Sequence, residues 1–229
     1  MPLSDRDYMR PSRGRWDSSG SGRARGYFNF GINPVWAIII ANLVLFIATL
    51  FAETGRYPLG DFFYTVSDKF TYYLGIIPYY FVERPWTILT AMFVHADFWH
   101  LFFNMMILFF FGSYLSRLVG NSWFTIVYFI GGIVGNLLFY LLGETYSVAV
   151  GASGAVYAIA GALVVLVPNL RVYLYFILPL PLWLVVLIFF VVWSIPGLIS
   201  GIAWQAHLGG MAVGLIAGFY FRRKRMAIY

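Results

Sequence analysis

The sequence predicts an all-α membrane protein with six transmembrane helices, and three observations point to this class. Of the 229 residues, 61% are hydrophobic and only 10% are charged, whereas about a quarter of residues are charged in soluble domains. Apolar runs recur along the chain at lengths close to the roughly 20 residues that cross the hydrocarbon of a bilayer. Basic residues cluster before the first run and after the last one. They place both ends in the cytoplasm, which requires an even number of spans.

The two ends are predicted to be polar cytoplasmic segments around one membrane domain, residues 33–221. Residues 1–32 are rich in Gly, Ser and Arg, a composition typical of a flexible basic tail. Residues 222–229 form a basic C-terminus. The net charge of +6 does not indicate nucleic-acid binding, because the basic residues flank the spans as topology signals do. The absence of cysteine excludes disulfides and thiolate metal sites, and we expect no metal or cofactor.

Each predicted span is bounded by caps, prolines or charges. In chain order, we place the six spans at residues 34–51, 100–117, 121–142, 153–167, 181–196 and 203–221. Asn33-Pro34 is a cap followed by proline at the first helical position, which favours a helix start. Asn121 is expected to cap the third span, and Pro168 ends the fourth.

Two connections are too polar or too rich in proline to be spans. Residues 53–98 mix many charged and aromatic residues, so we expect a long first outer loop lying at the membrane interface. Residues 169–180 include Arg171 and Pro179, which predicts a cytoplasmic surface segment that is not helical.

Four polar side chains fall at a similar predicted depth. We count about 1.5 Å per helical residue from the cytoplasmic boundary of each span. Ser153 and His207 then lie roughly 22 Å from that boundary, Asn104 about 20 Å and His100 about 26 Å. In a core of about 30 Å, all four lie a few ångströms below the outer surface. Ionisable groups are costly there, so they indicate function.

The fourth span is too short to reach the outer surface. Residues 144–152 must therefore descend as non-helical backbone, which is tolerated only where it lines a cavity. Gly151 and Gly154 fit a tight turn that leaves Ser153 at a helix N-terminus. Free N–H groups and the helix dipole favour developing negative charge at that position.

These residues match what nucleophilic hydrolysis requires. The Ser153 hydroxyl needs a base, and burial would keep His207 neutral enough to serve. His100 and Asn104 project from one helix face as i and i+4, and both can donate to an oxyanion. No carboxylate lies at that depth to orient His207, so a Ser-His dyad is predicted in place of a triad.

Plainer explanations exist for each residue alone. The Gly-Ala-Ser-Gly turn could be a packing motif, and His100 with Asn104 could be polar glue between helices. His207 could be a hydrogen-bonded core histidine. His95 precedes the second span, and we expect it to be structural, bonding the outer loop. Gly210 and Gly214 could bring their helix close to the small residues that follow Ser153.

Three stretches together resemble the rhomboid family of intramembrane serine proteases. They are His95-Ala-Asp-Phe-Trp-His100-Leu-Phe-Phe-Asn104, Gly151-Ala-Ser153-Gly-Ala-Val-Tyr157 and Ala206-His207-Leu-Gly-Gly210-Met-Ala-Val-Gly214. The resemblance covers about residues 33–221 and implies a six-helix rhomboid-like bundle with a short recessed fourth helix.

The resemblance also implies roles for individual residues. Ser153 would be the nucleophile and His207 the general base, while His100 and Asn104 would stabilise the oxyanion. Tyr157 would pack on the His207 ring, and Gly210 would close the sixth helix onto the fourth. Gly151 and His95 are counted with these supporting positions. Thr87 after Trp86, and Ser116, depart from the pattern that many relatives carry, at positions that support structure more than chemistry.

The resulting prediction is an endopeptidase that cleaves single-span membrane proteins in or near their spans through an acyl-enzyme. Its partners would be transmembrane substrates and membrane lipids, and a short cysteine-free chain favours a prokaryotic plasma membrane. No oligomeric state is predicted. The main alternative is a catalytically silent rhomboid-like binder of transmembrane helices. A small transporter or channel is less favoured, because the spans hold almost no carboxylates.

Overall fold

The computed structural model describes residues 33–52, 57–59, 62–64, 69–174, 177–194 and 203–224. All of them belong to one unit, residues 32–229, and residues 1–31 make up the other unit of the chain. The predicted basic tail and residues 225–229 lie outside the described residues, so their assigned character stays a prediction.

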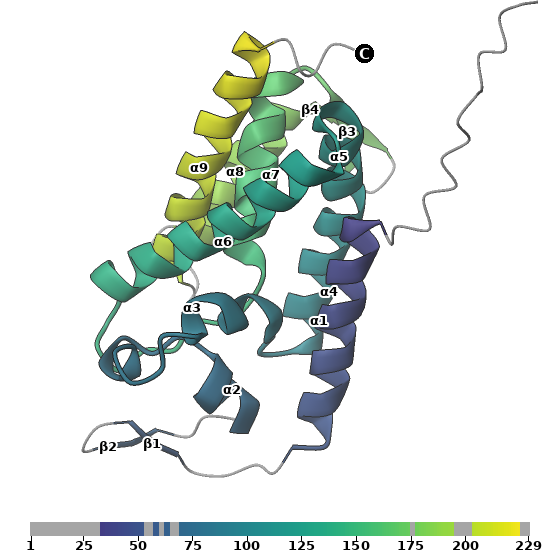
Figure 1. The fold of residues 1–229 in the computed structure, drawn as a ribbon. Coiled ribbons are helices and arrows are strands. Elements are labelled where there is room, and N and C mark those ends of the chain that lie inside the picture. The colour runs from purple at the N-terminus through teal and green to yellow at the C-terminus, as the bar shows by residue number, and fades with distance from the viewer. Residues whose placement is uncertain are drawn as a thin grey trace, which may run out of the picture. The chain divides into compact units, whose positions relative to one another are not determined.

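Helices occupy each of the six positions predicted from the apolar runs (Figure 1). The second of them is continuous through a π-helical turn, η4. In chain order the helices are α1 (Pro34–Leu50), α4 (Phe98–Ile107) with η4 (Leu108–Gly112) and α5 (Ser113–Val119), α6 (Asn121–Leu142), α7 (Ser153–Leu166), α8 (Leu182–Ser194) and α9 (Trp204–Arg223).

Two of the helices in the described residues are long and apolar enough to cross a membrane. They are the α4–α5 helix, Phe98–Val119, and α6, each 22 residues long. Pro34–Leu50, Ser153–Leu166 and Leu182–Val192 are apolar but shorter. The helices are thus where the sequence predicts them, and a count of six spans stays a prediction.

The cap predicted for the first helix is confirmed, and the cap predicted for the third is wrong. The Asn33 side chain accepts a hydrogen bond of 2.9 Å from the Val35 N–H. Before α6, the cap position belongs to Gly120, whose φ of 87° suits a residue without a side chain. Asn121 is the first residue inside the helix, and its side-chain oxygen accepts from the Ser116 hydroxyl.

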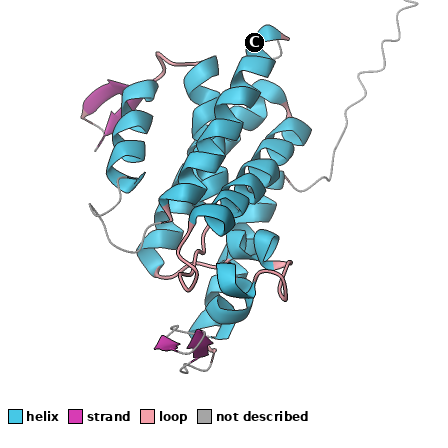
Figure 2. Cartoon of the chain, turned by 90° about the vertical axis from the view of Figure 1, so that its left-hand side faces the viewer, coloured by secondary structure: helices cyan, strands magenta, loops and turns pink. Residues whose placement is uncertain are grey.

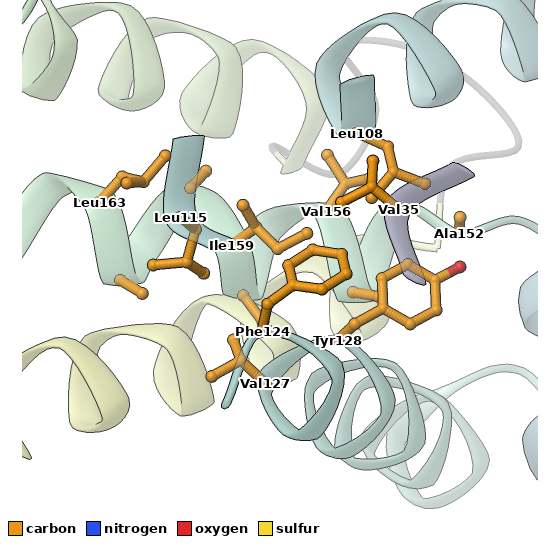
Figure 3. Packing of buried hydrophobic residues seen from close by; sticks show 14 of the residues in the cluster. Val35, Leu108, Leu115, Phe124, Val127, Tyr128, Ala152, Val156, Ile159 and Leu163 are labelled. Carbon is orange, nitrogen blue, oxygen red and sulfur yellow. The ribbon is translucent and has the colours of Figure 1, made fainter. Parts of the chain in front are cut away.

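Helix α7 lies at the centre of the packing and contacts α6, α9 and η4. Ten of its 14 residues are buried. Figure 3 shows Val156, Ile159 and Leu163 of α7 packed with Phe124 and Tyr128 of α6. Burial on every side suits a helix that carries a site inside the bundle.

Two short hairpins correct the all-α prediction. Strand β3 (Arg171–Leu174) pairs antiparallel with β4 (Leu178–Pro181), in the segment predicted to be non-helical. Strand β1 (Tyr57–Leu59) pairs with β2 (Phe62–Tyr64) in the first outer loop. Figure 2 shows the two hairpins at opposite ends of the helices. Neither was predicted, because a strand depends on a partner that local patterns do not reveal.

The rest of the first outer loop is built from short helical turns. These are α2 (Lys69–Leu74), η2 (Pro78–Tyr80), α3 (Thr87–Thr90) and η3 (Ala91–Phe93). The loop is fastened to the bundle at Asn136 of α6, whose side-chain amide donates to the Ile88 carbonyl at 2.9 Å.

Candidate active site

Ser153 stands at the first position of α7, after a turn that requires glycine. Gly151 has a φ of +116°, a conformation that L side chains rarely adopt. The His100 ring also fills the space beside it, since a Cβ on Gly151 would lie 2.6 Å from the ring's Cε1 and Nε2. The Gly151 N–H donates to the Ala91 carbonyl at 2.8 Å. The turn is therefore set by its own backbone, by α4 and by the first outer loop.

His207 of α9 faces this serine. Its Nε2 lies 3.0 Å from the Ser153 Oγ, a hydrogen-bonding distance. The imidazole is buried, with 6% of its residue surface exposed, while Ser153 is half-buried. The hydroxyl and the imidazole are thus in position for proton transfer between them.

The distance between these two side chains is set by a contact between helix backbones. A Cβ on Gly210 would overlap the carbonyl oxygen of Gly154, and a Cβ on Gly214 would overlap that of Ala158. Helix α9 meets α6 in the same way, since a Cβ on Gly135 of α6 would lie 2.6 Å from the Ala206 carbonyl oxygen. Helix α9 is therefore held between α6 and α7 with no side chain at the points of closest approach.

Tyr157 lies one turn after Ser153 and supports the imidazole. The Tyr157 and His207 ring centroids are 4.5 Å apart, with planes inclined by 37°. The Tyr157 hydroxyl donates to the Phe189 carbonyl of α8 at 3.2 Å, and its ring meets Phe190 edge-on at 5.7 Å. An aromatic face that restricts the imidazole can supply part of the orientation that a triad obtains from a carboxylate.

His95 and His100 lie together beside the turn formed by residues 151–153, here called the serine turn. Their ring centroids are 5.0 Å apart, and His95 Nε2 accepts a long hydrogen bond of 3.5 Å from the Ala152 N–H. Burial, together with the neighbouring His100, lowers the pKa of His95 to about 3. His95 is therefore neutral, as an acceptor must be, and its bond goes to the serine turn.

Asn104 is buried one turn further along α4. Its Nδ2 donates to the His100 carbonyl at 2.8 Å, within the same helix. No hydrogen bond from Asn104 to α7 occurs among the described residues. His100 thus contacts the serine turn directly, whereas Asn104 lies one helical turn after His100 on α4.

Sequence reasoning missed three residues that position this site. Asp97 caps α4 by accepting from the His100 N–H at 2.9 Å, and an acidic residue just before an apolar run is a recognisable cap signal. Ala91 and Phe189 contribute only backbone carbonyls, so no side-chain pattern could have identified them.

The fold and site define a helical protein with a serine–histidine pair at the start of a central helix. The family model described as the rhomboid domain matches residues 82–224, which is more than half of the chain. The chain belongs to the rhomboid family of intramembrane proteases.

Several relatives show the same similarity. The chain is 31% identical over 155 residues to rhomboid protein 1, mitochondrial, of Saccharomyces cerevisiae. This match covers 62% of this chain and 44% of the yeast protein. The chain is 34% identical over 163 residues to RHOMBOID-like protein 12, mitochondrial, of Arabidopsis thaliana, covering 62% and 48%. A Bacillus subtilis protein, YdcA, whose name marks it as a candidate rhomboid protease, is 32% identical over 153 residues, covering 63% and 71%. The match spans about half the length of the two mitochondrial relatives.

Proposed function

We propose that this protein is an intramembrane serine endopeptidase that cleaves single-span membrane proteins in or near their transmembrane segments. The observation that carries the proposal is the 3.0 Å approach of His207 Nε2 to Ser153 Oγ at the N-terminus of α7. Membership of the rhomboid family supports the same activity.

The proposed reaction proceeds through an acyl-enzyme. The Ser153 oxygen attacks the carbonyl carbon of the scissile bond as its proton passes to His207 Nε2. The tetrahedral intermediate collapses, the peptide C–N bond breaks, and the leaving amine takes the proton from His207. A water molecule then attacks the ester, giving its proton to His207, and the carboxylic acid leaves as Ser153 regains a proton.

The oxyanion would form beside the serine turn. The first N–H groups of a helix have no acceptor within the helix, so the Ser153 N–H at the start of α7 can donate to it. His100, whose ring lies against Gly151, is the nearest predicted side-chain donor. Asn104 would contribute from the same helix through the second N–H of its Nδ2, since the amide has two donors and one of them bonds the His100 carbonyl.

We further propose a multi-pass topology with both termini in the cytoplasm. The ends of α5 and α9 and the β3–β4 hairpin lie toward one end of the helices, opposite the first outer loop (Figure 1). That end carries basic residues without an acidic residue in the same segments: Arg117, Arg171, Arg222, Arg223 and Lys224. Such segregation is the pattern of a cytoplasmic face. A prokaryotic plasma membrane remains the proposed location.

The test is hydrolysis and active-site labelling in one experiment. The full chain is expressed with a transmembrane reporter substrate, and detergent extracts are treated with a fluorophosphonate probe. Wild type should cleave and be labelled, and Ser153→Ala should do neither. His207→Ala should lose at least about 10⁴-fold in rate, as removal of either member of such a pair does.

Ser122→Ala is the matched control. Ser122 is exposed in the first turn of α6, outside the serine turn and the segments bonded to it, so its loss should leave cleavage unchanged. Equal cleavage by Ser153→Ala would refute the proposal. A wild-type protein that captures transmembrane helices without cleavage or labelling would instead identify the silent binder.

A further inference from the structure

The first outer loop holds a guanidinium group among three tyrosine rings. The Arg84 Cζ lies 4.3 Å from the ring centroid of Tyr72, 4.4 Å from that of Tyr80 and 5.0 Å from that of Tyr73. Arg84 Nη1 also donates to the Tyr72 carbonyl at 2.9 Å. A planar cation stacked on aromatic faces is attracted to each of them. Arg84 therefore joins α2, η2 and the turn before α3 into one cluster, here called the Arg84 cluster.

The loop that contains the Arg84 cluster is hydrogen-bonded to residues 145–151, the segment that leads to Ser153. Ile76 and Ala149 exchange two backbone hydrogen bonds of 3.0 Å each. The Tyr79 N–H donates to the Thr145 carbonyl at 3.0 Å. With the bond from Gly151 to Ala91, residues 145–151 are attached to the loop at three places.

Side chains complete the same contact. A Cβ on Gly75 would lie 2.9 Å from Val150 Cγ1 and 3.1 Å from Val148 Cγ1, so the two segments meet closely. The rings of Tyr79 and Tyr146 are 5.0 Å apart. Because residues 145–151 are not helical, these contacts take the place of the internal hydrogen bonds that would otherwise hold their backbone.

We propose that Arg84 is a positioning residue for hydrolysis, acting through this loop on the serine turn. The Arg84 cluster fixes the position of residues 76–91, and these residues fix the position of residues 145–151 through the contacts described above. Residues 145–151 in turn fix the position of Gly151 and of the Ser153 N–H relative to the oxyanion. The catalytic part of this inference rests on the proposed protease function, whereas the mechanical part does not.

The mechanical part is tested by amide hydrogen exchange on the full chain in detergent. Arg84→Met keeps an apolar stem and removes the cation, and Arg84→Lys keeps a cation. We expect exchange in residues 145–151 to accelerate by about tenfold in Arg84→Met and by less in Arg84→Lys. Arg117→Met, which removes an exposed arginine at the end of α5, is the control and should change nothing there. Unchanged exchange in Arg84→Met would overturn the inference.

The catalytic part is tested by steady-state cleavage of the reporter substrate. For Arg84→Met we expect kcat to fall about tenfold while KM stays within about twofold of the wild-type value. The reason is that a displaced serine turn reduces stabilisation of the transition state more than it reduces substrate binding. Arg84→Lys should recover most of kcat. The Arg84→Met and wild-type proteins are also compared at a lower temperature, at which the variant is folded. If the two kcat values are equal there, Arg84 only stabilises the fold and the positioning role is overturned. An inactive wild type would overturn the proposed function, and the exchange comparison would still decide the mechanical part.

Discussion

The contact of α7 with α9 and the contact of α1 with η4 are made of different atoms. Between α7 and α9, Gly210 and Gly214 lie directly on the carbonyls of Gly154 and Ala158. Between α1 and η4, the rings of Trp36 and Phe109 meet at 5.3 Å. Side chains can adopt other rotamers after a substitution, whereas two touching backbones can only separate. Ser153 and His207 are placed across the contact that has no freedom to adjust.

The largest effect is expected from enlarging Gly210. Gly210→Leu would force α9 away from α7, costing about 3 kcal/mol or more of unfolding free energy and separating His207 from Ser153. Thermal unfolding in detergent and fluorophosphonate labelling measure both losses. Ala212→Leu, on an exposed position of the same helix, should leave both unchanged. A Gly210→Leu protein with wild-type stability and labelling would contradict the backbone contact.

A smaller, more local effect is expected at the serine turn. Gly151→Ala should reduce labelling by about 100-fold, as a misplacement of about 1 Å does, because its methyl group meets the His100 ring. Gly120 also has a positive φ, but a Cβ there meets nothing within 4 Å. Gly120→Ala therefore reports backbone strain alone, about 1–3 kcal/mol, and should keep labelling in the folded protein. Equal labelling loss in both variants would mean that strain, and not His100, sets the turn.

The side-chain contact should tolerate change. In a double-mutant cycle of Trp36→Leu and Phe109→Leu, we expect a coupling of about 0.5–1.5 kcal/mol, the usual strength of an aromatic pair. The specific activity of the folded protein should not change. A loss of activity comparable to that of Gly210→Leu would show that both helix contacts position the site, and the comparison would fail.

The smallest effect is expected from Tyr157→Phe. This change removes the hydroxyl bond to α8 but keeps the ring on His207, so stability should fall by about 0.6 kcal/mol, the average for such bonds inside membrane proteins. Tyr157→Leu also removes the ring and should reduce kcat much further. The two kcat values, measured on the reporter substrate, separate the roles. If Tyr157→Phe loses as much kcat as Tyr157→Leu, the link to α8 matters more than the ring.

The helices could be predicted from the sequence because apolar length and caps are local properties. Asn33 and the short α7 follow from a few neighbouring residues each. The cap prediction at Asn121 was wrong because Gly120, which has a positive φ, occupies the cap position. Which of the two residues caps α6 depends on the turn between α5 and α6. The hairpins were missed because each strand also depends on another segment, its pairing partner.

For the candidate site, the sequence indicated which side chains to consider but not how the fold brings them together. Counting residues put Ser153 and His207 at one depth, but depth does not give the lateral distance between two helices. His95 was expected to bond the outer loop, and the structure adds a hydrogen bond from the Ala152 N–H of the serine turn. The backbone carbonyl of Ala91 carries no sequence signal, yet it holds Gly151.

The sequence by itself determined which segments are helical, that the fourth helix is short, and which side chains are candidates for hydrolytic chemistry. These follow from hydrophobic length, from the conformational limits of glycine and proline, and from the cost of placing ionisable groups in hydrocarbon. Only the tertiary structure decided that the serine and histidine meet at 3.0 Å and that the first outer loop is attached to the serine turn. Both depend on backbone contacts between distant segments, which no local pattern of side chains specifies.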